Sequence, residues 1–166
     1  MRRMSSPATV AELFRDTMAG LVSGVAVLTT RRSDASPCGL LATSVSAFSA
    51  APPSVLTSIG HTSRCYHALA ESDHFGVHIL RADQQRLAHV FSSLVEDKFD
   101  GVDWSWDADV PELGGTIAYL RCRREALFEL YDHSIVIGDL IGGRRDGGEP
   151  LVYFDRRMDW RLESAS

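Results

Sequence analysis

The segment Leu41-Ala42-Thr43-Ser44-Val45-Ser46-Ala47-Phe48 is the most informative stretch of this sequence. It belongs to a predicted strand over residues 38–48, yet hydroxyl-bearing and small side chains stand where a core strand carries large apolar ones. Small side chains let a planar ligand approach the backbone, and hydroxyl groups can bond phosphate or sugar oxygens. A partly exposed strand that tolerates Ser and Thr explains the same composition, and composition by itself favours that second interpretation.

Short apolar segments elsewhere predict further strands, at residues 24–30, 54–59 (interrupted at Gly60), 75–80, 115–130, 133–141 and 151–154, with an edge at 160–162. Short helices are predicted over residues 10–18, capped by Thr9 or Ser6, and over 63–71 and 83–91. Residues 96–109 and 142–149 are predicted to be irregular. Because the strands do not alternate with helices, the pattern predicts a mainly β fold, an antiparallel barrel with short helices at its ends.

The 166 residues fit one domain, with the polar residues 1–8 expected to be frayed. A net charge of -5, with both signs interspersed, argues against nucleic acid or an anionic membrane as the main partner. No apolar run follows the N-terminal arginines, and no stretch is long enough to span a bilayer. We therefore expect a cytoplasmic protein.

The three cysteines, Cys38, Cys65 and Cys122, are widely spaced and odd in number. That pattern does not suit a disulfide framework, so we expect unpaired thiols in or near the core. The six histidines show no metal-binding spacing, and no metal site is expected.

Three further motifs have both a functional and an ordinary interpretation. Gly60-His61-Thr62-Ser63-Arg64 precedes a predicted helix and suits a phosphate, although Thr62 or Ser63 also fits a simple helix cap. Asp132-His133 opens a strand and can orient an imidazole, although a turn Asp before an exposed His is as common. Lys98-Phe99 offers a phosphate contact and a stacking ring, or merely a solvated Lys beside an anchoring Phe.

Taken in order, these motifs make the chain resemble the short-chain flavin reductase family. The resemblance rests on Phe14-Arg15, SGVAVLTT (residues 23–30), GLLATSVSAFS (residues 39–49) with Pro52-Pro53, FGVHIL (residues 75–80), Phe91, Lys98-Phe99, Asp132-His133 and PLVYF (residues 150–154). It covers residues 13 to 160. Such enzymes are the small reductase components of two-component flavin-dependent monooxygenases.

The resemblance implies a Greek-key-like split β-barrel that works as a homodimer with flavin at the subunit interface. It implies hydride transfer from NADH, or NADPH, to FMN or FAD, and release of the reduced flavin to a separate monooxygenase. It places His133 near the nicotinamide. The residues that it implies for flavin binding are Thr43, Ser44, Val45 and Ser46 along the ring and ribityl chain, Gly60, His61, Thr62, Ser63 and Arg64 at the phosphate end, and Lys98 and Phe99.

The sequence also departs from the family pattern. Tyr131 replaces the glycine of the family's Gly-Asp-His motif, and His78 stands where Asn is common. Gly60 and Cys65 stand where Asn and Thr are frequent, which removes two polar contacts from the phosphate-side loop. Two other functions stay open: an oxidase on the same barrel, like the pyridoxamine-phosphate oxidases, and a flavin-binding protein that does not turn over.

Overall fold

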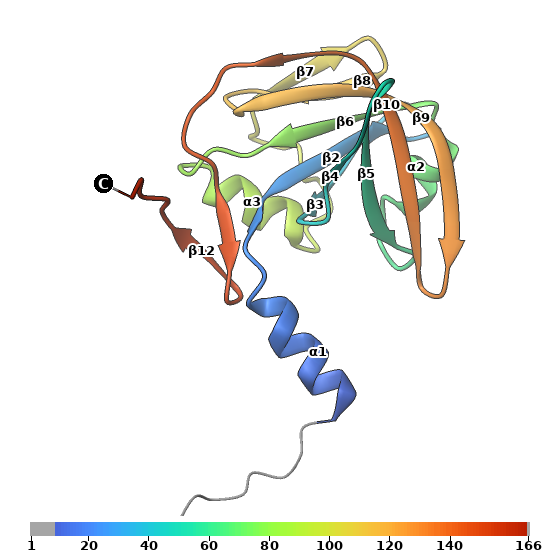
Figure 1. Ribbon diagram of the computed structural model, residues 1–166. Helices are drawn as coiled ribbons and strands as arrows, with labels where there is room; N and C mark the ends of the chain where they lie inside the picture. The colour runs from blue at the N-terminus through green and yellow to red at the C-terminus, as the bar shows by residue number, and fades with distance from the viewer. Residues whose placement is uncertain (1–8, 166) are drawn as a thin grey trace, which may run out of the picture.

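A seven-stranded antiparallel sheet dominates the computed structural model, which describes residues 9–165 (Figure 1). Its strand order is β3-β2-β6-β9-β10-β5-β4. These strands are β2 (Ala26–Arg31), β3 (Pro37–Ala42), β4 (Ser46–Ala50), β5 (Pro53–Gly60), β6 (His74–Ile79), β9 (Ala118–Leu130) and β10 (His133–Arg145). The prediction of a mainly β, antiparallel fold is confirmed.

Two smaller sheets and three helices complete the described chain. β1 (Ser23–Gly24), β11 (Val152–Phe154) and β12 (Arg157–Trp160) form one sheet, and β7 (Trp104–Asp107) pairs with β8 (Val110–Leu113) in the other. The helices are α1 (Val10–Ala19), α2 (Tyr66–Glu71) and α3 (Gln85–Ser92). Across residues 9–165, no helix has the length and apolar character that a membrane crossing requires.

Thr9 caps α1, as predicted. The Glu12 amide donates to Thr9 Oγ1 at 3.2 Å, and the Thr9 amide donates to Glu12 Oε2 at 2.7 Å. This reciprocal pair satisfies two donors that the first turn would otherwise leave free. The alternative cap Ser6 and the expectation of frayed residues 1–8 lie outside the described residues. α1 projects away from the sheets (Figure 1).

The apolar strand β2 is buried on both of its faces, which explains why its sequence does not alternate. Ala26 and Leu28 belong to one core cluster, together with Leu69 of α2. Val27 belongs to a second cluster, together with Phe91 of α3. The two short helices therefore cover opposite sides of the same strand.

The prediction of one continuous strand over residues 38–48 is wrong. β3 ends at Ala42 and β4 begins at Ser46, and the two strands lie at opposite ends of the seven-stranded order. Between them, Ser44 leaves the strand pattern: its hydroxyl donates to the Ser58 carbonyl and accepts from the Ser58 amide, each at 3.1 Å. A side-chain hydroxyl thus takes over the bonds of a strand ladder and lets the chain change direction.

Three other predicted boundaries also need correction. Gly60 does not interrupt its strand, because it pairs with His133 in the β5–β10 ladder. β10 continues through the predicted glycine-rich turn to Arg145, paired with Ala118 of β9. Residues 104–107, within the segment predicted to be irregular, form β7. In each case pairing with a partner strand outweighs the local glycine or acidic composition.

Candidate functional site

A cavity of about 820 Å³ opens along the end strand β3 of the large sheet. Its walls also include the loop before α2, the C-terminal end of α3 and the loop that follows α3. Six of the predicted flavin-binding residues line this cavity: Thr43, Thr62, Ser63, Arg64, Lys98 and Phe99. Hydroxyl groups and cations from three separate segments therefore meet in one concave site, and that combination suits a phosphorylated ligand.

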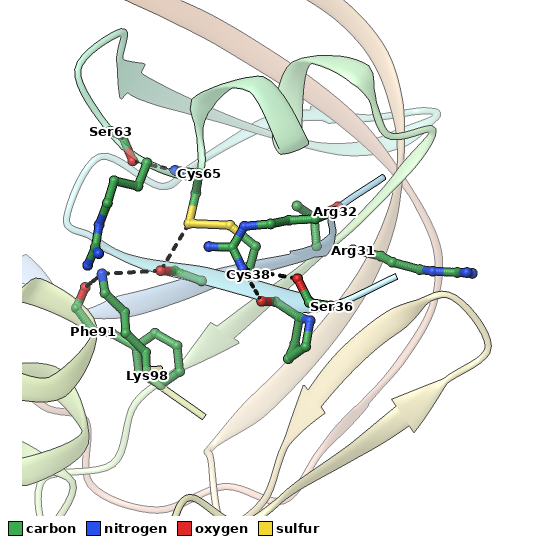
Figure 2. The surroundings of a disulfide bond; sticks show 12 residues. Arg31, Arg32, Ser36, Cys38, Ser63, Cys65, Phe91 and Lys98 are labelled. Carbon is green, nitrogen blue, oxygen red and sulfur yellow. Dashed lines mark hydrogen bonds between the residues drawn. A yellow bond between two sulfur atoms is a disulfide. The ribbon is translucent and has the colours of Figure 1, made fainter. Parts of the chain in front are cut away.

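The expectation that Cys38 and Cys65 carry free thiols is wrong: the two residues form a disulfide (Figure 2). The bond links β3 to the residue preceding α2, across a Cα–Cα distance of 6.0 Å and a sequence separation of 27. The fold brings them together because α2 packs over the face of the sheet that Cys38 occupies. Cys122 is the remaining cysteine, free and buried, as expected.

Both disulfide-bonded residues line the cavity, and their surroundings are polar. The Gly39 carbonyl oxygen lies 3.2 Å from Cys65 Sγ and 3.4 Å from Lys98 Nζ. Gly39 must be a glycine here, because a Cβ at this position would overlap the ring of Phe91. The close packing of α3 on β3 fixes the cavity wall at this point.

Lys98 lies half-buried in the cavity wall. Its ammonium group donates to the Phe91 carbonyl at 2.7 Å, at the end of α3. Burial lowers the pKa of Lys98, and the positive charges of Arg64 and Arg32 lower it further. Three cations thus lie near one another at the cavity.

Phe99 serves mainly as an anchor. It is buried, and its ring meets those of Phe91 and Trp104 edge to face, with centroids 5.2 and 5.1 Å away. Most of the Phe99 ring therefore serves as the anchor that the ordinary interpretation of Lys98-Phe99 describes. The residue still borders the cavity.

The other predicted site residues lie outside the cavity lining. Ser44 is bonded to β5, as described above, and Val45 packs against the core cluster under α2. Ser46 is exposed at the start of β4. The segment of residues 43–46 is therefore divided: Thr43 lines the cavity and the other three residues do not.

Gly60 and His61 lie beside His133, whereas residues 62–64 of the same loop line the cavity. His133 pairs with Gly60, and the His61 amide donates to the Asp132 carbonyl at 2.9 Å. His61 Nε2 lies 2.9 Å from the hydroxyl of the buried Ser134, which also lies 3.1 Å from the Tyr66 hydroxyl. The predicted phosphate loop thus divides after His61.

His133 is exposed and oriented by its neighbour. Its Nδ1 lies 2.8 Å from Asp132 Oδ1, and this hydrogen bond lowers the pKa of the Asp132 carboxyl. The absence of a side chain at Gly60 leaves room beside the imidazole, since a Cβ there would lie 3.5 Å from His133 Nε2. The imidazole is therefore free to contact a ligand on one side while Asp132 holds the other.

Comparison with known proteins assigns the chain to a family. The model of the flavin reductase like domain matches residues 18–160. The chain belongs to the flavin reductase family. FMN reductase (NADH) SmoA of Agrobacterium fabrum is 34% identical over 141 residues, covering 84% of this chain and 80% of that protein. Flavin reductase (NADH) of Kitasatospora aureofaciens is 34% identical over 158 residues, covering 92% and 83% respectively.

A solved structure agrees over almost the full length of this flavin reductase family member. The NADH:FAD oxidoreductase SgcE6 of Streptomyces globisporus, in complex with NAD and FAD fragments, matches with a TM-score of 0.88 at 28% identity. The match covers 98% of this chain and 100% of that one. The resemblance inferred from the ordered motifs is confirmed.

Sequence reasoning did not identify Arg32 or the cysteine pair as parts of the cavity. Arg32 belongs to the Arg31-Arg32 dipeptide of a polar turn, where an exposed arginine is the ordinary expectation. A signal was present in Cys65, which replaces a residue that is often Thr in the family, but a pairing over 27 positions has no local signature.

The backbone conformation at Tyr131 accounts for the glycine that the family pattern has at this position. It occupies the two-residue turn between β9 and β10 with φ of 55°, a left-handed conformation that costs a residue with a Cβ roughly 1 kcal/mol. The residue is 91% exposed, so the ring adds little packing. We expect Tyr131→Gly to raise the free energy of unfolding by about 1 kcal/mol in urea titrations.

Tyr131→Ala is the matched control for this prediction, because it removes the ring and keeps the penalty of positive φ. Equal stabilities of the Gly and Ala variants would show that the turn is not strained.

Proposed function

We propose that this flavin reductase family member oxidises NADH, reduces FMN or FAD, and supplies the reduced flavin to a separate monooxygenase. One observation carries the proposal: hydroxyl and cationic groups from the motif segments converge in a single cavity beside β3. The names of relatives support it. Similar proteins include reductase components of trigonelline and 4-nitrophenol monooxygenases. We place this activity in the cytoplasm, where NADH is regenerated.

The residues of the cavity fit a flavin nucleotide. Arg64 and Lys98 would bind its phosphate end, and Thr62 and Ser63 would donate hydroxyl hydrogen bonds there. The ring and ribityl chain would extend over Thr43 toward Ser44, Val45 and Ser46. When bound, the flavin supplies the electron-accepting ring for the hydride of NADH, so this chain contributes mainly positioning.

We also infer that the large sheet curls into a single split-barrel domain. Its end strands β3 and β4 are joined by residues 43–45 alone. A step from Ala42 to Ser46 spans at most about 14 Å, whereas seven strands in a flat sheet extend over roughly 29 Å. Curling of the sheet toward closure accounts for this short connection.

A homodimer is part of the same proposal. α1 and the segment after it leave a row of large apolar side chains exposed, namely Val10, Leu13, Phe14, Met18, Leu21 and Val22. An apolar surface of this kind is typical of a protein interface, and a helix that projects from its own sheets needs a partner to bury it.

One assay separates the proposed function from its rivals. The purified protein is mixed with NADH or NADPH and with FMN, FAD or riboflavin, and nicotinamide absorbance is followed. Rapid oxidation that depends on added flavin supports the reductase. Tightly bound yellow flavin without NADH oxidation would favour an oxidase of the pyridoxamine-phosphate oxidase type. Stoichiometric flavin binding with no turnover in any pairing would favour a non-catalytic flavin-binding protein.

His133→Ala tests the role proposed for the imidazole. If His133 hydrogen-bonds the nicotinamide, its loss should raise the KM for NADH about tenfold, the worth of one hydrogen bond. Flavin affinity should change little, because His133 does not line the cavity. Steady-state kinetics at saturating flavin measures the effect, with the exposed His89→Ala as control. Unchanged KM and kcat would contradict the assignment.

A further inference from the structure

Three cations at the cavity lack a carboxylate partner. Among residues 9–165, Arg32, Arg64 and Lys98 form no ion pair with Asp or Glu. Their charged groups donate mainly to backbone carbonyls: Arg32 to Pro37 at 2.6 Å, and Arg64 to Val95 at 2.6 Å. Family resemblance pointed to Arg64 and Lys98, whereas nothing in the motifs pointed to Arg32.

The edge of β3 brings Arg32 and Lys98 to the same side. Arg32 donates to the Pro37 carbonyl and Lys98 approaches the Gly39 carbonyl, two residues further along the strand. Carbonyls two residues apart on a strand point the same way and are separated by roughly 7 Å. Figure 2 shows both side chains directed toward this strand, beside the disulfide.

Within the described part of the chain, Arg32 has hydrogen-bond donors that no protein group uses. Arg32 uses Nη1 for Pro37 and for the Ser36 hydroxyl, which leaves Nε and Nη2 available. The mutual repulsion of the three cations is felt at Lys98, whose pKa is lowered by burial and by both arginines. An anion between them would relieve it. Glu96, Asp97 and Asp100 also line the cavity. Among residues 9–165 none of the three pairs with these cations, and Asp97 accepts hydrogen bonds from the Phe99 and Asp100 amides of its own loop.

We infer that Arg32 is a further ligand for the phosphate of the flavin nucleotide, and that with Arg64 and Lys98 it makes the site prefer phosphorylated flavins to riboflavin. This inference rests on the proposed function. The shared chemistry is a phosphoryl group, either the monoester of FMN or the diphosphate of FAD. Planar guanidinium groups bind such groups through two parallel hydrogen bonds.

Arg32→Gln tests the inference, and Arg31→Gln is its matched control. Arg31 is adjacent and carries the same charge, but it is exposed, does not line the cavity and points away from the disulfide in Figure 2. Binding of FMN, FAD and riboflavin to the full chain is measured by fluorescence titration without NADH. Arg32→Gln should weaken FMN, FAD or both roughly 10- to 100-fold and leave riboflavin within about twofold. Arg31→Gln should leave all three flavins within about twofold, because exposed charges are screened.

A second variant and a parallel assay make the result decisive. Arg32→Lys keeps the charge but loses the paired hydrogen bonds of the guanidinium group, so it should recover only part of the FMN affinity that Arg32→Gln loses. Equal flavin affinities in Arg32→Gln and Arg31→Gln, or an equal loss for riboflavin and FMN, would overturn the inference. If wild-type protein still oxidises NADH when flavin is added, only the role of Arg32 has failed. If it binds no flavin and oxidises no NADH, the proposed function itself has failed.

Discussion

Loss of the Cys38–Cys65 bond is expected to lower the free energy of unfolding by about 3.5 kcal/mol. The estimate follows from the loop that the bond closes, whose ends are 27 residues apart, because a cross-link restricts the unfolded chain. The double variant Cys38→Ala/Cys65→Ala and the reduced wild-type protein should both show it. Urea unfolding with and without a thiol reductant gives the measurement.

The double variant supplies the control for this experiment. Its stability should not respond to reductant, since Cys122 is the remaining cysteine and is buried and unpaired. Titration of the denatured, unreduced wild-type protein should find one free thiol. Three thiols, or the same urea midpoint for oxidised and reduced protein, would contradict the pairing.

The bond also connects the parts of the cavity that hold its cations. Cys38 lies between Pro37 and Gly39, whose carbonyls accept from Arg32 and Lys98, and Cys65 directly follows Arg64. Reduction would remove the covalent link between two walls of the same site. We therefore expect reduction to weaken FMN binding before it unfolds the protein.

Acid is expected to destabilise the protein through His78. This imidazole is fully buried, and burial is the main reason that its pKa falls from 6.5 to about 3. Its Nδ1 lies 3.2 Å from the Val27 carbonyl, whereas Nε2 has no hydrogen-bond partner among residues 9–165. The ring also stacks on Tyr119, with centroids 4.9 Å apart.

The sign of the effect follows from proton uptake. Between pH 6.5 and 3 the unfolded chain binds a proton at His78 that the native state does not bind. The free energy of unfolding should therefore fall as pH falls, by about 1.4 kcal/mol per pH unit from this residue. Above pH 6.5 the contribution of His78 is constant.

His78→Asn isolates this contribution, because Asn does not titrate and can still donate to the Val27 carbonyl. Urea unfolding at pH 7, 6 and 5 should show a shallower loss of stability in the variant than in the wild type. The difference in slope should be about 1 kcal/mol per pH unit below pH 6. Parallel slopes would mean that His78 is protonated or hydrated in the folded protein.

The sequence predicted those elements whose cause lies within a few neighbouring residues. The continuous apolar run of β2 indicated a strand because both of its faces are buried, and Thr9 indicated a helix start because its cap lies within one turn. The break at residues 43–45 could not be seen in the same way. It depends on Ser44 bonding to Ser58 of another strand.

The candidate site shows the same division. Arg64 and Lys98 were found through ordered family motifs, and the fold brings both to one cavity. His61 was assigned to the same end of the flavin, but its bond to Ser134 holds it beside His133. No pattern within a single segment reveals which strand a loop residue will meet, so the position of His61 had to come from the structure.

The position of β3 at the end of the large sheet has a consequence for aggregation of the protein at high concentration. An end strand offers backbone groups to which a strand from another molecule can add, and this is a common start of aggregation. Here the outward carbonyls of Pro37 and Gly39 are already contacted by Arg32 and Lys98. Positive charges along such an edge repel an incoming copy of themselves. The same two side chains therefore oppose aggregation by strand addition at this edge of the sheet.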